Sequence, residues 1–340
     1  MFNKVYEKIK QFMKENIKYI LIFLIGYLVL TYPLPYYIYT GGGTININDR
    51  VEVADADDSQ GSLHFAYVKE LRGNVASFLL AQLMHWDMEK EEEMKLSEDD
   101  TSEDIAFRNH IYLENANQTA ILLAYSKAGK KAMIKDRHFY VLYVENSDEA
   151  NLQVGDEIIS VDGKQMVDTS TYTDVVAQKE IGEQIEVGII RDEKEMTVMA
   201  RVQDIDGKKL TGVSITTIYE YETDPKLELH FKQSESGPSG GLMLTLAIYD
   251  KLVAEDITHG KKIVGTGTIA SDGTVGEIGG VKYKLQGAVA SKADIFLVPA
   301  GSNYEEAKAE QEKNHYDIVI QPVATFEEAL DFLESLDDNT

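Results

Sequence analysis

The pattern of apolar and polar positions predicts alternating helices and strands in the second half of the chain. Residues 242–249 are apolar except for one threonine, which is too uniform for a surface helix and predicts a buried one. Residues 262–269 and 274–278 flank an Asp-Gly pair, Asp272-Gly273, and such a pair between two apolar runs predicts a β-hairpin. A second helix is predicted directly after the hairpin, over residues 281–292. This mixture of strands and helices indicates an α+β fold.

The helix after the hairpin contains two lysines that point in different directions. Val281, Lys284, Leu285 and Ala288 share one face at three- and four-residue steps, whereas Lys282 lies about 100° away from it. A lysine that faces a core loses hydration, so its pKa falls and it can act as a neutral base near pH 7. The alternative is a lysine whose stem packs against the core while its amine reaches water.

A serine lies in the glycine-rich turn just before the buried helix, at position 239 within Ser-Gly-Pro-Ser-Gly-Gly. At a helix N-terminus, free backbone N–H groups and the helix dipole favour developing negative charge. A serine hydroxyl is a weak nucleophile until a base takes its proton, and Ser-Lys pairs meet that need. Ser239 and Lys284 are therefore candidate nucleophile and base, the alternative being a glycine-rich turn without chemistry.

These motifs resemble those of the proteolytic domain of Lon proteases, over about residues 210–335. The nucleophile motif of that family is Gly-Pro-Ser-Ala-Gly, and its base is the second lysine of Gly-Gly-x-Lys-x-Lys, here Lys284. The resemblance implies a ribosomal S5 domain 2-like fold, a Ser-Lys dyad, a hydrogen bond between Thr266 and the lysine, and substrate contacts at Gly237 and Gly240. Gly240 replaces the alanine of the family, which would loosen the start of the helix and lower catalytic efficiency.

Residues 131–203 resemble a PDZ domain. The resemblance lies in residues 150–164, which predict a short strand followed by an Asp-Gly turn. It implies a peptide groove between an edge strand, residues 138–144, and a helix, residues 171–179. An extended substrate would add to the edge strand through main-chain hydrogen bonds and contact Phe139, Tyr140 and Val141.

The carboxylate-binding loop usual in PDZ domains, Gly-Leu-Gly-Phe, is replaced by residues 136–139. Internal or unfolded segments are therefore expected in the groove rather than free C-termini. The alternative is a PDZ fold that serves only as a spacer.

The N-terminal region combines a basic stretch with an uncharged one. Five lysines precede residue 19, and no charged residue follows until Asp49. This predicts a transmembrane anchor over residues 19–39, with residues 1–18 in the cytoplasm and the remainder outside the cell. A cleaved signal peptide is the alternative, but no small-x-small cleavage site follows the apolar residues. Residues 40–130 are expected to form an N-terminal extracellular region that packs with the PDZ domain.

The composition and the absence of certain motifs argue against several kinds of partner and cofactor. A net charge of −25 argues against nucleic acid as a partner, and the absence of cysteine excludes disulfides and thiolate metal sites. No H-x-x-x-H spacing and no G-x-x-x-x-G-K-[ST] motif occur, so neither a metal, nor ATP, nor another cofactor is expected.

The order of anchor, PDZ domain and Lon-like domain resembles the membrane-anchored PDZ–Lon-like serine proteases of Gram-positive bacteria, including the pheromone-processing type. The resemblance implies an ATP-independent serine endopeptidase. Its substrates would be secreted peptides such as signalling pheromones, or unfolded or membrane-protein segments presented by the PDZ domain, and it allows a homo-oligomer. The alternative is a non-catalytic PDZ scaffold that binds peptides at the membrane surface.

Overall fold

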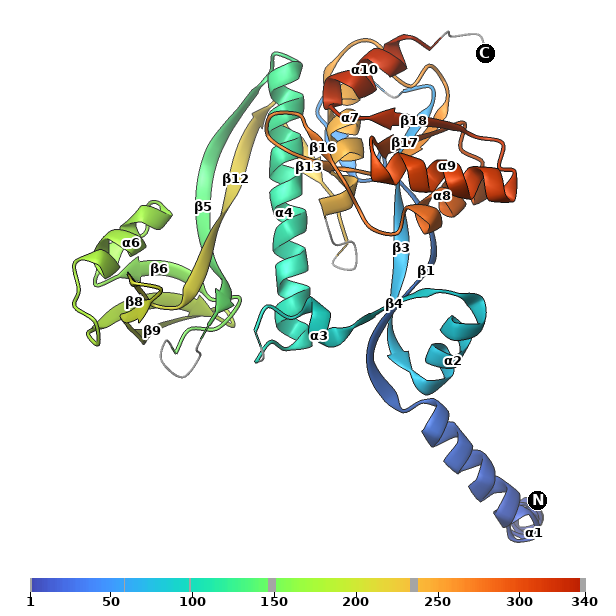
Figure 1. Cartoon of the computed structure of the whole chain (residues 1–340). Helices are drawn as coiled ribbons and strands as arrows, with labels where there is room; N and C mark the ends of the chain where they lie inside the picture. The colour runs from blue at the N-terminus through green and yellow to red at the C-terminus, as the bar shows by residue number, and fades with distance from the viewer. Residues whose placement is uncertain (1, 58, 98, 146–150, 233–237, 337–340) are drawn as a thin grey trace. The chain divides into compact units, whose positions relative to one another are not determined.

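The computed structural model describes residues 2–57, 59–97, 99–145, 151–232 and 238–336. The chain divides into two compact units, residues 1–41 with 68–94 and residues 42–67 with 95–340. Strands β1 (Pro33–Asn46) and β3 (Ser62–Asn74) run through both of them (Figure 1). Each unit is therefore assembled from two separate stretches of sequence.

The first unit contains the long helix α1 (Phe2–Leu30) and a small α/β element. The latter consists of α2 (Val75–Met84), β4 (Asp87–Lys90) and α3 (Glu91–Met94). Strand β4 pairs antiparallel with β1 from Tyr36↔Lys90 to Tyr39↔Asp87. Helix α2 begins with a capping box, in which the Asn74 and Ser77 side chains each accept a backbone N–H of the other residue.

The predicted anchor over residues 19–39 is not helical throughout. Helix α1 ends at Leu30, and Pro33 begins strand β1, because a proline and the residue before it favour extended backbone. The uncharged part of α1, residues 19–30, is about 18 Å long at the helical rise per residue. Within the described residues, no helix combines the length and the apolar character that a membrane crossing requires.

In the second unit, the predicted PDZ domain is an antiparallel sheet in the order β12-β5-β6-β8-β9, with β7 paired to β6. A short hairpin, β10 with β11, precedes β12. Helix α6 packs Tyr172, Val175 and Val176 into the core of this domain. The elements are β5 (Lys131–Val144), β6 (Glu157–Val161), β7 (Lys164–Gln165), α6 (Thr169–Ala177), β8 (Gln184–Arg191), β9 (Lys194–Arg201), β10 (Gln203–Ile205), β11 (Lys208–Leu210) and β12 (Val213–Asp224).

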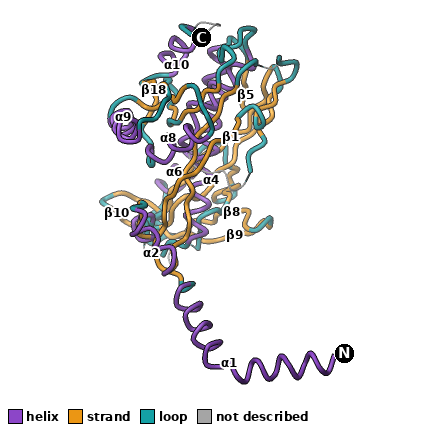
Figure 2. Tube along the Cα trace, turned by 90° about the vertical axis from the view of Figure 1, so that its right-hand side faces the viewer, coloured by secondary structure: helices purple, strands orange, loops and turns teal. Residues whose placement is uncertain are grey.

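The predicted catalytic domain contains parallel strands in the order β18-β17-β14-β3. Helices α8 and α9 lie side by side (Figures 1 and 2), and α4 packs against α7. The elements are β2 (Val51–Val53), α4 (Ser102–Lys127), β13 (Leu227–Leu229), the 3₁₀ turn η1 (Pro238–Gly240), α7 (Gly241–Leu252), β14 (Lys262–Gly265), β15 (Thr268–Ile269), β16 (Val275–Gly276), α8 (Val281–Ala290), β17 (Ile295–Pro299), α9 (Ser302–Asn314), β18 (Val319–Val323) and α10 (Phe326–Glu334).

Two separate cores form on the two faces of this parallel sheet, because successive side chains of a strand point to opposite faces. On β14, Ile263 belongs to the core that contains α7, whereas Val264 belongs to the core that contains α8. The predicted buried helix over residues 242–249 is confirmed as α7, and the predicted hairpin is confirmed by the pairing of β15 with β16.

Two predicted domain boundaries differ from the structure. The predicted packing of residues 40–130 with the PDZ domain holds for part of α4, where the Phe107 ring lies 5.8 Å from the Tyr140 ring of β5. Leu63 of β3 and Leu123 of α4 lie in the α7 core instead. Strand β12 lies within the stretch predicted as the proteolytic domain, yet it pairs with β5 of the PDZ sheet along its whole length. Both differences arise from pairing between segments that are distant in sequence.

Candidate active site

The turn that contains Ser239 is held by the segment that follows β14. The Ser239 carbonyl oxygen accepts two hydrogen bonds, from the Gly267 N–H at 2.8 Å and from the Thr266 hydroxyl at 3.0 Å. The Leu242 N–H donates in return to the Gly267 carbonyl at 3.1 Å. Ser239 is itself half-buried in η1, directly before α7. The nucleophile candidate therefore occupies a fixed turn at a helix N-terminus.

Lys284 lies almost completely inside the protein. It is 3% exposed on α8, on the face that also buries Val281, Leu285 and Ala288. Its Nζ donates a hydrogen bond to the Thr266 hydroxyl at 3.1 Å, as the sequence analysis predicted. Burial disfavours the charged amine and lowers the pKa of Lys284 from 10.5 to about 8.

Thr266 connects the base candidate to the turn of the nucleophile candidate. Its side chain is fully buried, and its hydroxyl accepts from the Lys284 Nζ and donates to the Ser239 carbonyl. Lys282, two residues before Lys284, is only partly buried, and its Nζ lies 4.7 Å from the centre of the Tyr283 ring. The structure thus brings Ser239, Thr266 and Lys284 together and gives Lys282 a different environment.

Two glycines next to Ser239, Gly237 and Gly240, were predicted to contact substrate. Gly237 lies outside the described residues. Gly240 is the N-cap of α7, with φ −97° and ψ −1°, a conformation that any residue adopts. A Cβ atom there would lie 3.6 Å from the ring of Phe65, an ordinary contact. The backbone therefore does not require glycine here, which agrees with the alanine that the family motif has at this position.

Two contacts that sequence reasoning missed position the helix of Lys284. Asn303, 5% exposed, accepts from the Ile278 N–H at 2.8 Å and donates to the Ile278 carbonyl at 3.0 Å, which fixes the segment before α8. A Cβ atom on Gly287 would lie 3.1 Å from the Gly43 carbonyl, so α8 approaches β1 closely at this point. Gly43 lies in β1.

The strand predicted to form the edge of the PDZ peptide groove is not an edge strand of its sheet. Residues 138–144 of β5 are not an edge, since β12 pairs with them on one side and β6 pairs at Tyr140 on the other. The side chains of Phe139 and Val141 are 3% and 0% exposed. The edge-strand prediction is therefore wrong, and no free strand edge supports a substrate role for Phe139, Tyr140 and Val141.

One of the two terminal strands of that sheet, β12, contacts α6. Val213 and Ile215 of β12 pack against the core that includes α6. Just before β12, the Thr211 hydroxyl lies 2.9 Å from the Tyr172 hydroxyl of α6. The arrangement of an edge strand beside a helix, expected for β5, is thus found at β12.

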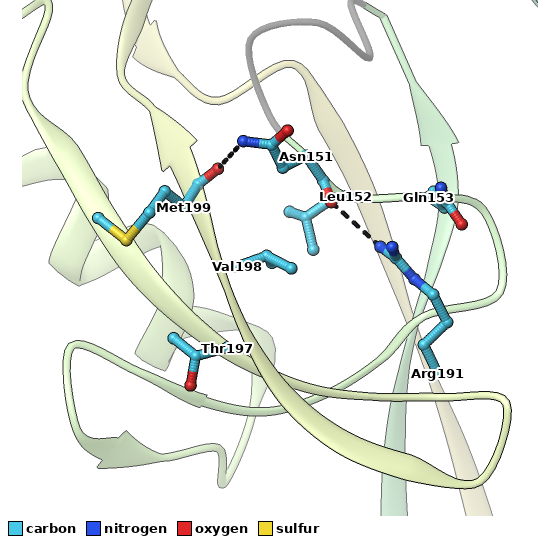
Figure 3. A pocket seen from close by; sticks show the side chains of 7 residues that line it. All are labelled: Asn151, Leu152, Gln153, Arg191, Thr197, Val198 and Met199. Atoms are coloured by element: carbon cyan, nitrogen blue, oxygen red, sulfur yellow. Dashed lines mark hydrogen bonds between the residues drawn. The ribbon is translucent and has the colours of Figure 1, made fainter.

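A cavity of ≈ 610 Å³ lies elsewhere on the PDZ domain (Figure 3). Within it, Asn151 donates to the Met199 carbonyl and Arg191 donates to the Asn151 carbonyl, while Arg191 also binds the Asp156 carboxylate. The lining residues are Asn151, Leu152, Gln153, Arg191, Thr197, Val198 and Met199. None of them was predicted to act in catalysis, and the arginine charge is already paired.

One group of potential metal ligands occurs in the described part of the chain. Glu52 on β2, Glu228 on β13 and His230 bring their ligand atoms within 4.8 Å of one another, and all three side chains are exposed. Exposed acidic groups on neighbouring strands are common without an ion, so these residues do not define a metal centre.

Comparisons with known proteins assign both domains. Residues 119–202 match the family model of the PDZ domain, and residues 223–334 match that of the Lon protease (S16) C-terminal proteolytic domain. A Lon protease of Neorickettsia sennetsu is 36% identical over 99 residues, which are 29% of this chain and 12% of that protein. The match therefore covers a small part of the length of that relative.

Solved structures with similarity to the chain include two PDZ domains of SdrC-like proteins. The one from Listeria monocytogenes is 19% identical with a TM-score of 0.22, and covers 24% of this chain and 92% of its own. The one from Listeria innocua is 20% identical with a TM-score of 0.21, and covers 23% of this chain and 92% of its own. Likeness at this level adds no further evidence.

Proposed function

We propose that this chain, which carries a PDZ domain and a Lon-type (S16) proteolytic domain and hence a serine peptidase fold, is an ATP-independent endopeptidase with a Ser239–Lys284 dyad. One observation carries the proposal. Lys284 is buried, its pKa is lowered, and it is joined through the Thr266 hydroxyl to the backbone of Ser239. A lysine that only supports the fold would not need its amine inside the protein.

The proposed reaction begins with proton transfer. Neutral Lys284 takes the proton of the Ser239 hydroxyl, and the serine oxygen attacks the scissile carbonyl. The protonated lysine then gives the proton to the leaving amine, so the peptide C–N bond breaks and an acyl-serine remains. Water hydrolyses this ester with Lys284 again as the base. Thr266 orients the amine, because its hydroxyl contacts both the Lys284 Nζ and the turn of Ser239.

The oxyanion of the tetrahedral intermediate would be stabilised at the start of α7. The first backbone N–H groups of a helix have no partner within the helix, and they point toward the space before it. The Leu242 N–H already donates to the Gly267 carbonyl, so the proposed donors are the N–H groups of η1 and of Gly241. Ser239 lies in η1, two residues before α7 begins at Gly241. Loss of one such donor typically raises the barrier by about 3 kcal/mol.

Substrate is proposed to bind in extended form at the free edge of β12, beside α6. An extended segment can add to a sheet edge through main-chain hydrogen bonds. The net charge of −25 favours basic segments, since it attracts them over long distances. The proposed substrates are secreted peptides such as signalling pheromones, or unfolded or membrane-protein segments, which would bind as such extended segments.

Attachment to a membrane is part of the same proposal. It is supported by the uncharged residues 19–30 of α1, whose large apolar side chains are mostly exposed, and by the five lysines that precede them. Those lysines favour a cytoplasmic N-terminus, which would place the catalytic domain outside the cell. Labelling of introduced cysteines with a membrane-impermeant reagent in intact cells would test this orientation.

The decisive experiment is cleavage of an unstructured basic peptide by the full chain in detergent, without ATP. Ser239→Ala and Lys284→Ala should each lose activity by roughly a thousandfold or more, whereas Lys282→Ala should keep it. Cleavage that survives in Ser239→Ala would contradict the dyad. A wild-type chain that leaves the peptide intact at pH 9 would favour a non-catalytic PDZ scaffold.

A further inference from the structure

Helix α2 presents an apolar surface to the outside of its unit. Residues 75–84 contain no charged side chain. Four large apolar residues on the helix, Leu79, Leu80, Leu83 and Met84, are 57%, 44%, 75% and 54% exposed. Soluble proteins rarely expose a contiguous group of large apolar side chains unless a partner binds there. The capping box at Asn74 shows that α2 is a well-formed helix and not a collapsed loop.

This surface lies beside the apolar end of α1, within the same unit. The Val75 N–H, at the first position of α2, donates to the Tyr32 carbonyl just after α1, at 3.2 Å. Tyr36 and Phe78 bring their rings to 5.4 Å. Both views show α2 next to the C-terminal end of α1 (Figures 1 and 2). The exposed side chains of the two helices therefore belong to one region.

We infer that α2 and residues 19–30 of α1 form a single lipid-binding surface, with α2 lying along the membrane interface. The inference rests on the proposed membrane attachment and goes beyond it, because it assigns a second element to the bilayer. At ten residues α2 is about 15 Å long, half of the ~30 Å hydrocarbon core, so it can lie at the interface but cannot cross.

The character of the surface favours lipid over a protein partner. Residues 19–30 expose large apolar side chains around the whole helix, and a helix that is apolar all round suits acyl chains, whereas a partner helix covers one stripe. Aromatic residues flank both apolar stretches: Tyr32 follows α1, and Trp86 follows α2. Tyrosine and tryptophan prefer the headgroup level of a bilayer.

The test uses the fact that the chain contains no cysteine. Leu83→Cys is labelled with an environment-sensitive fluorophore in the full chain, which is then reconstituted into vesicles of phosphatidylcholine and phosphatidylglycerol. Two matched positions serve as references: Ile22→Cys on α1 and Lys194→Cys at the exposed start of β9. Peptide cleavage by each labelled variant reports on the fold, since none of the three positions belongs to the catalytic machinery.

The inference predicts a several-fold rise in fluorescence at Leu83→Cys and quenching by lipids that carry a nitroxide on the acyl chain. Lys194→Cys should show neither. If Ile22→Cys is quenched and Leu83→Cys is not, α2 is not at the bilayer and the inference fails alone. A rise at Leu83→Cys that ignores the nitroxide but depends on protein concentration would assign the surface to a second copy. If Ile22→Cys is also unquenched, the proposed membrane attachment itself fails.

Discussion

The amine of Lys284 is held inside an otherwise apolar helix face, and this has a consequence for stability. Burial lowers its pKa from 10.5 to about 8. Between these two pH values the unfolded chain binds more protons than the folded one, so the free energy of unfolding rises with pH across this window. At pH 7 the lysine is protonated in both states, and keeping the charge buried costs about 3 kcal/mol.

Replacement of this lysine by an apolar residue should therefore stabilise the protein while it removes activity. Lys284→Met keeps the volume of the side chain, and its free energy of unfolding at pH 7 should exceed that of the wild type by up to about 3 kcal/mol. The advantage should shrink as the pH approaches 10. Urea unfolding at both pH values measures the difference, with Lys282→Met as the control. Equal stability of Lys284→Met and wild type at both pH values would mean that the lysine is not desolvated.

At the scale of elements, the nucleophile turn depends on close packing between η1, α7 and the hairpin. A Cβ atom on Gly241 would lie 2.8 Å from the Ile269 Cγ2 and 3.2 Å from its backbone nitrogen, so Gly241→Ala should destabilise the fold by about 1–3 kcal/mol. Gly240→Ala, which restores the alanine of the family motif, has room and should cost less than about 1 kcal/mol. Thermal unfolding and peptide cleavage measure the loss of stability and of activity in each of the two variants. A larger loss in Gly240→Ala than in Gly241→Ala would contradict the geometry.

Local signals explain which elements the sequence could predict. The apolar run of α7, the Asp-Gly turn of the hairpin and the apolar face around Lys284 are all visible within short windows. The pairing of β12 with β5 and of β3 with β14 cannot be seen within a short window of sequence, because the register between distant strands depends on which faces become buried together. This is why the groove edge was assigned to β5. Asn303 carries no sequence signal, since its role arises only from its contact with Ile278.

At the scale of the whole molecule, the excess of acidic residues should select among substrates. With 58 acidic and 33 basic residues, the chain attracts basic peptides, and salt screens this attraction within a Debye length of about 8 Å at 0.15 M. A basic peptide should therefore be cleaved with a higher kcat/KM than an acidic peptide of the same length around the same scissile bond. The difference should fall as salt rises from 20 mM to 500 mM, roughly. A preference that salt does not alter would place selectivity in local contacts.

The central claim, that Lys284 is the base for Ser239, is tested most directly by the pH dependence of single-turnover peptide cleavage. The amine must be neutral to accept the serine proton, and its pKa is lowered to about 8. The rate should therefore rise with pH, with a midpoint near 8, and level off above it. Lys282→Ala should follow the same curve. A rate that stays flat from about pH 5 to 9, or falls as the pH rises through 8, would contradict lysine as the base.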